Sequence, residues 1–327
     1  MKISVIVATY NDPQLERCLD SLYVSQDADF EVIVIDDGST TIDIEQIVRN
    51  FPAYRCFKFE KNTGPAIGRN FGAKQAKGEI LFFLDSDAQV YPDTLIKIQR
   101  RFEKEPKLQG LSILWSDEPV KNTFFNKFKA IEMNYNFKHL FNRSWGSNGS
   151  AIYKDIFLAE GGFDEKFRKV YGEDFFLGMK LFDKGYNISF DKNILMKHCF
   201  YEKCFLGLKK YSIRAFLRAK ELGSVKNKVE TSYNSKRFQV LYLLSIFIIF
   251  FGLLGLFIPL LFLVAIGLYL IFFNLNFKLY IAFYKKYGLT FFIKAAITHY
   301  FYILLISISG ILGFTIGKMS KKKSYGF

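Results

Sequence analysis

The last ninety residues of this 327-residue chain contain no aspartate or glutamate, although they contain eight lysines. Within them, residues 238–277 carry no charge of either sign, and residues 295–317 form a second uncharged run. A helix that crosses a bilayer needs about 20 apolar residues, and forty uncharged residues are too many for one buried core helix. The lack of charge therefore predicts that this part of the chain inserts into a membrane.

Cysteine is also scarce. The four cysteines, at positions 18, 56, 199 and 204, include no pair with C-x-x-C spacing. This pattern argues against both a zinc site and a disulfide framework. It is typical of a reducing compartment.

The net charge of +14 is concentrated in the second half of the chain. Residues 1–196 contain 26 basic and 28 acidic residues, whereas residues 197–237 contain eleven basic and three acidic ones. The basic excess borders the uncharged runs, so it predicts contact with anionic membrane lipids rather than nucleic acid. Positive charge also marks the cytoplasmic side. We expect a multi-pass cell-membrane protein whose soluble part is cytoplasmic.

Residues 1–115 alternate short apolar runs with segments of helical periodicity. Repeated β-α units of this length predict a doubly wound α/β fold with a mostly parallel sheet. A further helix, predicted over residues 121–143, has an aromatic face that we expect to pack on the sheet rather than on a membrane surface. The expected strands cover residues 3–8, 31–35, 54–59, 79–84 and 151–153, and the expected helices cover residues 13–23, 42–50, 66–77 and 91–103.

Three acidic motifs lie where ligands bind such sheets: Asp36-Asp37, Asp85-Ser86-Asp87 and Glu173-Asp174. The carboxyl ends of parallel strands meet at one edge, so these acids can line one cleft. The central pair suits a divalent cation that also binds substrate phosphates. Asp174 can act as a general base, and Arg69 can bind phosphate oxygens. Each acid alone could equally cap a helix, but the three motifs together favour a cleft.

Several sequence blocks resemble the family 2 glycosyltransferases, which have the GT-A fold. The resemblance covers about residues 2–220, and the blocks occur in the family's order and spacing. They read SVIVATYN at 4–11, VIDDGST at 34–40, NTG at 62–64, GRNFGA at 68–73, FLDSDA at 83–88, GGFDE at 161–165 and GEDFFL at 172–177.

The resemblance implies a nucleotide-sugar donor, with a UDP-sugar expected before a GDP-sugar, a Mg²⁺ or Mn²⁺ ion, and transfer with inversion at the anomeric carbon. It places Asp87 on the metal and Asp85 on the metal or the ribose. It makes Asp174 the catalytic base, with Glu173 beside it. The remaining residues that it assigns to the nucleotide sugar are Thr9, Asn11, Asp36, Asp37 and Arg69.

Beyond residue 200 the resemblance weakens, because the Gln-x-x-Arg-Trp block of sugar-polymerising members is absent. Arg214 or Arg218 could reach the diphosphate, but a solvated or lipid-facing charge fits these positions equally well. His198 lies in a block where the family often has a histidine. It could serve the metal or its ligands, although a structural role is the simpler interpretation.

Two acceptors fit a membrane-bound enzyme of this kind: a hydroxyl on a lipid-linked or cell-surface glycan, or the phosphate of a polyprenyl carrier. A phosphate is already a nucleophile and needs no general base, so Asp174 favours the hydroxyl. An inactive scaffold on the same fold is the non-enzymatic alternative, but the intact acidic motifs argue against it.

The sequence predicts four regions along the chain. The first is a GT-A catalytic domain, and an all-α membrane region follows it after a short basic linker. Gly252, Gly255 and Pro259 interrupt the longer uncharged run, which suggests two spans joined by a tight turn. The predicted regions are 1–220 (catalytic), 221–237 (linker), 238–318 (membrane, with two or three spans near 238–257, 259–277 and 295–317) and 319–327 (basic tail).

Overall fold

The computed structural model describes residues 1–25, 27–140, 145–166, 172–224 and 236–320. They divide into two compact units. One unit comprises Met1–Val120 and Asn136–Cys199, and the other comprises Lys121–Tyr135 and Phe200–Phe327. The predicted basic linker and tail lie partly outside the described residues, at 225–235 and 321–327.

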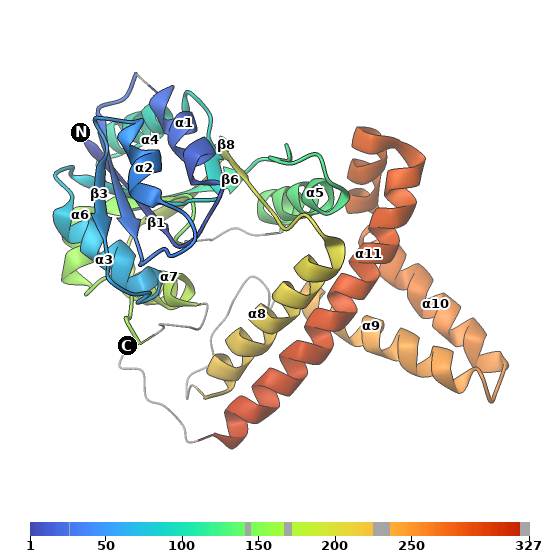
Figure 1. Cartoon of the computed structure of the whole chain (residues 1–327). Helices are drawn as coiled ribbons and strands as arrows, with labels where there is room; N and C mark the ends of the chain where they lie inside the picture. The colour runs from blue at the N-terminus through green and yellow to red at the C-terminus, as the bar shows by residue number, and fades with distance from the viewer. Residues whose placement is uncertain (26, 141–144, 167–171, 225–235, 321–327) are drawn as a thin grey trace. The chain divides into compact units, whose positions relative to one another are not determined.

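An eight-stranded sheet forms the centre of the first unit, in the order β3-β2-β1-β4-β7-β6-β8-β5 (Figure 1). Strands β1 to β4 pair in parallel, which confirms the predicted α/β sheet. The other half is mixed, because β7 is antiparallel to β4 and β6, and β5 is antiparallel to β8. The strands are β1 Ile3–Thr9, β2 Phe30–Asp36, β3 Arg55–Lys58, β4 Ile80–Asp85, β5 Ala88–Val90, β6 Gly110–Trp115, β7 Ser150–Tyr153 and β8 Ile188–His198.

Helices cover both faces of this sheet (Figure 1). Side chains alternate across a strand, so Val5 and Val7 of β1 pack on one face while Ile6 between them packs on the other. Apolar residues on both faces explain why the strands read as continuous hydrophobic runs. The first face carries α1 (Leu15–Tyr23), α2 (Ile44–Arg49) and α4 (Thr94–Lys104), and the second carries α3 (Pro65–Gln75), α6 (Lys154–Ala159) and α7 (Glu173–Asp183).

The second unit is helical. It contains most of α5 (Phe124–His139), together with α8 (Cys204–Ser224), α9 (Lys236–Leu254), α10 (Leu260–Leu275) and α11 (Phe277–Met319). The prediction that α5 packs on the sheet is wrong for most of its length. Phe125 and Phe128 are buried against α11, where the Phe128 ring lies 5.5 Å from that of Phe283. Near the end of α5, Phe137 contacts Trp115 of β6 and Phe190 of β8.

Helix α11 is not one straight rod. Gly288 has a φ of 80° and interrupts the helical backbone. The Tyr280 hydroxyl lies 3.1 Å from Nδ1 of His299, so the segment before Gly288 folds back along the segment after it. Glycine suits this break because it adopts positive φ without strain.

The longer arm of α11 lies in close contact with α8. A Cβ added at Gly313 would collide with the carbonyl oxygen of Phe216, and one at Gly317 with that of Lys220. The two backbones can therefore approach only because both positions are glycine. Small residues spaced four apart allow the same close approach between helices in membranes.

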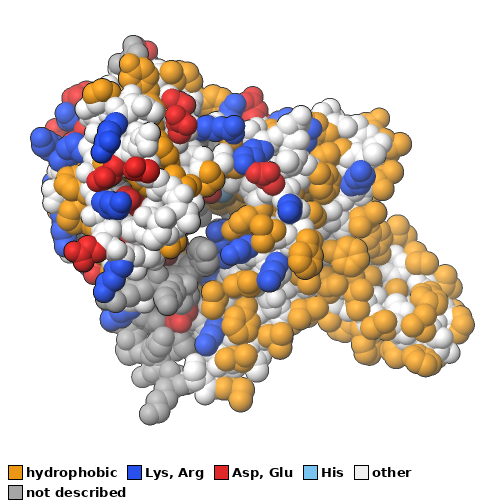
Figure 2. Space-filling view, viewed as in Figure 1, with side chains coloured by type: hydrophobic (Ala, Val, Ile, Leu, Met, Phe, Trp, Pro, Cys, Tyr) orange, Lys and Arg blue, Asp and Glu red, His pale blue; other side chains and the backbone are white. Residues whose placement is uncertain are grey.

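By length and composition alone, α9 and α11 are apolar enough to cross a membrane, while α10 is shorter. Hydrophobic side chains cover the visible surface of α9 and α10 (Figure 2). At the turn between them, Phe257 is 83% exposed. Such a surface would be costly in water.

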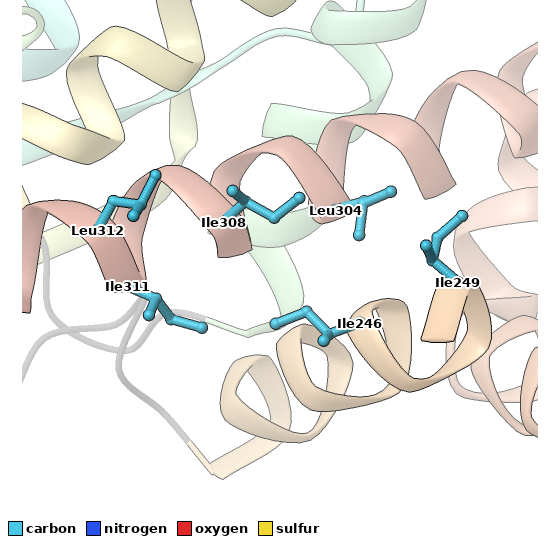
Figure 3. A pocket seen from close by; sticks show the side chains of 6 residues that line it. All are labelled: Ile246, Ile249, Leu304, Ile308, Ile311 and Leu312. Atoms are coloured by element: carbon cyan, nitrogen blue, oxygen red, sulfur yellow. The ribbon is translucent and has the colours of Figure 1, made fainter. Parts of the chain in front are cut away.

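Six aliphatic side chains of α9 and α11 line a groove of about 210 Å³ (Figure 3). They are Ile246, Ile249, Leu304, Ile308, Ile311 and Leu312. Beside this groove, the hydroxyl groups of Ser245 and Ser307 lie 3.2 Å apart. The groove itself has no polar side chain among its lining residues.

Candidate active site

Arg69 lies at the centre of the acidic edge of the sheet. Its guanidinium binds Oδ1 of Asp85 and Oε1 of Glu173, each at 2.7 Å. Arg69 is only 6% exposed, and α3 places it beneath the end of β4. The resemblance to family 2 places Arg69 near the nucleotide. The structure adds that it joins two of the three acidic motifs.

Charges around Arg69 shift the pKa values of this cluster. Burial opposes the charge of Arg69, but the Asp85 and Glu173 carboxylates raise its pKa above the ordinary value. For Glu173, burial and the charge of Asp174 raise the pKa despite the nearby guanidinium. Glu173 also accepts a hydrogen bond from the backbone of Gly172. Glu173 is thus committed to positioning Arg69 and the start of α7.

Asp85, Asp87 and His198 form a candidate metal site. Each offers a ligand atom, and these atoms all lie within 4.8 Å of one another. His198 Nε2 lies 3.4 Å from Oδ1 of Asp87. Ligand bonds to Mg²⁺ are about 2.0–2.1 Å long, so two atoms that bind one ion lie at most about 4.2 Å apart, and the 3.4 Å between these two atoms is within that limit. The residues therefore fit a divalent cation.

Strand pairing brings His198 to this position. In the β5–β8 pair, Ala88 lies opposite His198, so the histidine is next to Asp87. The Trp115 ring stacks on the imidazole at 4.7 Å between ring centres. These contacts are compatible with a metal-site role for His198, which stays a prediction. Two carboxylates and an imidazole suit Mn²⁺ better than Mg²⁺, which prefers oxygen ligands.

Asp174 begins α7 and faces the loop before β7. Its Oδ2 accepts hydrogen bonds from the backbone N–H and the hydroxyl of Ser147, at 3.1 and 3.2 Å. Its Oδ1 accepts from the backbone of Phe175 at 2.7 Å. These donors hold the carboxylate in one orientation. Asp174 is partly exposed, unlike the buried Glu173, so it is the better candidate for the base.

The two carboxylates of the Asp36-Asp37 motif have different hydrogen-bond partners. Asp37 accepts hydrogen bonds from Thr63 and from the backbone of Gly64, at 2.7–2.8 Å. It thereby shapes the turn before α3. Asp36 accepts from the backbone of Ser39, but its buried Oδ2 has no hydrogen-bond partner in the described part of the chain. The same is true of the hydroxyl of Thr9. A nucleoside contact by Asp36, Asp37 or Thr9 stays a prediction.

Asn11 joins the loops after β1 and β2. Its Oδ1 accepts hydrogen bonds from the backbones of Thr40 and Thr41, and its own backbone N–H donates to the Ser39 hydroxyl. Asn11 has a φ of +49°, a conformation that asparagine tolerates better than most residues. A nucleotide contact by Asn11 remains a prediction.

Four residues of this edge were missed by sequence reasoning: Asp12, Trp115, Ser147 and Asn148. The Asp12 carboxylate accepts a 2.5 Å hydrogen bond from the hydroxyl of Ser86, between the two metal-site aspartates. Asn148 accepts from the backbone of Asp85 at 3.3 Å. The small-residue turn at 146–150 was visible in the sequence, but its contacts with the acids were not.

Arg214 and Arg218 belong to α8, in the helical unit. The Arg214 guanidinium donates to the Tyr201 hydroxyl at 3.3 Å and lies 5.7 Å from the centre of the Tyr211 ring. These contacts lie within the helical unit. A diphosphate contact by either arginine remains a prediction.

A doubly wound sheet with an acidic edge of this kind defines the GT-A class of glycosyltransferase folds. Residues 4–157, which include strands β1 to β7 apart from the first residue of β1, match the model of glycosyl transferase family 2. The resemblance found in the sequence is thereby confirmed.

Curated relatives agree with this assignment. An uncharacterized glycosyltransferase of Haemophilus influenzae is 31% identical over 179 residues, which cover 54% of this chain and 60% of the relative. The poly(ribitol-phosphate) beta-N-acetylglucosaminyltransferase TarS of Staphylococcus aureus is 42% identical over 102 residues, covering 29% of this chain and 18% of TarS. The chain thus spans less than two thirds of either relative.

Among solved structures, the mannosyltransferase PcManGT of Pyrobaculum calidifontis, in complex with GDP-Man and Mn²⁺, has a TM-score of 0.54. It is 18% identical, and the match covers 97% of this chain and 86% of the mannosyltransferase. At this identity the similarity concerns the fold. The fold similarity extends over both units of the chain.

Proposed function

We propose that the protein is a membrane-anchored, metal-dependent, inverting glycosyltransferase. It would move a sugar from a nucleotide-sugar donor to a hydroxyl of a lipid-linked or cell-surface glycan. The observation that carries this proposal is the ion-pair bridge of Arg69. It holds Asp85 of the candidate metal site and Glu173, the neighbour of the candidate base Asp174, on one guanidinium.

Each residue has a defined role in this mechanism. Asp85, Asp87 and His198 would hold the ion, which when bound neutralises the charge that develops on the departing diphosphate. Asp36 and Thr9 have unmatched polar atoms that suit the nucleoside. Arg69 keeps Asp85 oriented, and Glu173 keeps Arg69 in place.

Asp174 would take the proton from the attacking acceptor hydroxyl. Its position favours this role over a structural one, because Ser147 orients Oδ2 without burying the whole carboxylate. A phosphate acceptor would not need this base. The arrangement therefore supports a hydroxyl acceptor over a polyprenyl phosphate.

Membrane anchoring is supported by the apolar surfaces of α9, α10 and α11. We assign the catalytic unit to the cytoplasmic side because basic residues cluster at 197–237, beside the apolar helices. The intact acids and the ordered base argue against an inactive scaffold.

The direct test uses the purified full-length chain with a panel of UDP- and GDP-sugars. Nucleotide release would be measured with Mn²⁺, with Mg²⁺ and with EDTA. We expect release from one or a few donors, faster with Mn²⁺ than with Mg²⁺ and abolished by EDTA. The Asp85→Asn/Asp87→Asn variant is the control for metal-dependent release. No release above this control, with any donor and a panel of glycan acceptors, would contradict the proposal.

A further inference from the structure

In the side-chain amide of Asn148, the oxygen has a hydrogen-bond partner, whereas the NH₂ group has none in the described part of the chain. Strands β4 and β7 pair with Phe83 opposite Ser150, and beyond this pair Asn148 lies near Asp85. Its Oδ1 accepts a hydrogen bond from the backbone N–H of Asp85 at 3.3 Å. Because the oxygen of the amide faces Asp85, the NH₂ group faces elsewhere.

That NH₂ group is the unusual feature. Nδ2 of Asn148 is buried and has no hydrogen-bond partner in the described part of the chain. A buried donor without an acceptor costs about 1–3 kcal/mol, and native proteins rarely leave one unmatched. A ligand oxygen at this point would remove the penalty, so the donor is a candidate for recognition.

The backbone around Asn148 is held firmly. The Trp115 indole N–H, on the ring that stacks on His198, points to the carbonyl oxygen of Asn148 at 3.5 Å. Gly149 has a φ of +82°, and a Cβ there would lie 2.7 Å from the Met196 side chain. This φ favours glycine, and the backbone of Gly149 is hydrogen-bonded on both sides. Its N–H donates to the carbonyl oxygen of Phe83 at 3.0 Å, and its carbonyl oxygen accepts from the N–H of Ile113 at 2.9 Å. Asn148 is therefore pre-positioned.

The location identifies the class of ligand. Asn148 contacts the Asp85 backbone, on the metal side of the site, and follows Ser147, which orients the candidate base Asp174. In a direct displacement, the sugar ring must lie between the diphosphate and the base. The loop at 146–149 would thus lie beside the sugar.

We propose that Asn148 is a specificity-determining residue that donates a hydrogen bond from Nδ2 to a hydroxyl oxygen of the donor's sugar. This inference rests on the proposed function. A site that hydrogen-bonds a substrate hydroxyl rejects analogues that lack it, because its own polar group is then left unmatched. Asn148 would in this way select among sugars that share one nucleotide.

The test is a cycle of protein and substrate changes. The full-length wild type and Asn148→Ala are compared with the best donor of the panel and with its monodeoxy analogues. We expect Asn148→Ala to lower kcat/KM about tenfold or more for the parent donor. For the one analogue that lacks the contacted hydroxyl, the kcat/KM of the variant should differ from that of the wild type by less than about threefold.

Two controls separate recognition from structural support of Asp85. Asn148→Asp keeps an oxygen for the Asp85 N–H but loses the donor, so it should share the loss of discrimination. Ser147→Ala removes a contact to Asp174 and should lower kcat by the same factor for every analogue. Affinity for the free nucleotide with Mn²⁺ should be unchanged in Asn148→Ala.

Two results would overturn the inference. One is that Asn148→Ala lowers kcat/KM by the same factor for the parent donor and for every analogue. The other is that Asn148→Ala weakens binding of the free nucleotide as much as binding of the nucleotide sugar. Calorimetry provides a reading that needs no turnover. The wild type should bind the nucleotide sugar more tightly than the nucleotide, and Asn148→Ala should lose this gain. If the wild type binds no nucleotide sugar and releases no nucleotide, the proposed function itself fails. If the wild type is active but the losses caused by Asn148→Ala and by removal of each hydroxyl simply add, only the role of Asn148 is refuted.

Discussion

Arg69 and Glu173 are 104 residues apart in the chain, yet they form a buried ion pair 2.7 Å long. This pair joins α3 to α7, and α7 also carries Asp174. Because the same guanidinium binds Asp85, the candidate metal site and the candidate base depend on one side chain. A defect in Arg69 should therefore affect both.

We expect Arg69→Lys to lower kcat/KM at least tenfold and to lower the free energy of unfolding by about 1–3 kcal/mol. Lysine keeps the charge, but its single ammonium lacks the planar fork that spans two carboxylates. Nucleotide release and thermal unfolding would measure the two effects. The matched control is Arg55→Lys, because Arg55 pairs with Glu31 at 2.9 Å in a more exposed position away from the site. Equal effects of the two changes would refute the central role of Arg69.

Asp174→Asn should reduce kcat by about 10²–10⁴-fold, the usual contribution of a positioned general base. The amide keeps the shape of the carboxylate, so affinity for the nucleotide sugar should survive. Single-turnover kinetics and calorimetry measure these separately. Full activity in this variant would rule out Asp174 as the base, and lost binding would indicate a structural role.

His198→Ala should raise the Mn²⁺ concentration that gives half-maximal activity by about tenfold or more. The variant removes the nitrogen ligand that the described residues offer to the candidate site. Trp115→Ala removes the stacked ring while keeping the imidazole, so its effect should be smaller. Unchanged Mn²⁺ dependence in His198→Ala would exclude the imidazole from the metal site.

We expect the stability of the protein to depend on pH through the carboxylate of Glu160. It accepts hydrogen bonds from Lys184 and from the hydroxyl of Tyr186, and these contacts lower its pKa to about 2. Because the pKa of Glu160 is lower in the folded than in the unfolded state, the ionised carboxylate stabilises the folded protein above about pH 4.3. This stabilisation is lost as the pH falls towards 2. Glu160→Gln should therefore lower the Tm by a few degrees at pH 7, corresponding to about 1 kcal/mol.

Differential scanning calorimetry from pH 7 to pH 3 would test this expectation. The difference in Tm between the wild type and Glu160→Gln should shrink as the pH falls below about 4.3. A difference that stays constant with pH would show that the carboxylate charge is not responsible.

Gly313 offers a test of the helical unit with a matched control. Gly313→Ala should cost about 1–3 kcal/mol, because its Cβ would collide with the Phe216 carbonyl oxygen of α8. Gly310 lies one turn earlier on α11, and a Cβ there would meet nothing within 4 Å. Gly310→Ala should be neutral or slightly stabilising. Thermal unfolding in detergent compares the two, and equal Tm values would contradict the close α8–α11 contact.

Sequence reasoning located the acids correctly because strand ends are local features. Asp85 follows a run of apolar residues that predicts a buried strand, and the structure ends β4 there. The sequence could not place His198 beside Asp87, since that contact depends on the long-range pairing of β5 with β8. The sequence-based roles of Thr9, Asn11 and Asp37 still await experiment.

The packing of α5 and the role of Asn148 could also not be predicted from the sequence, for a different reason. The aromatic face of α5 has the same helical spacing whether it packs on a sheet or on α11, so periodicity could not decide between them. Asn148 looks like an ordinary turn residue in the sequence. Its unmatched donor becomes visible only when every neighbouring acceptor is in place.

The loops that surround the candidate nucleoside site are tied to one another by side chains. Asn11 holds the loop after β2, Asp37 holds the turn before α3, and Asp12 holds Ser86. The entropy of ordering these loops is therefore lost when the chain folds and not when the nucleotide arrives. Rigid nucleotide mimics should associate with this enzyme in a single rapid step, without a slow phase of loop rearrangement.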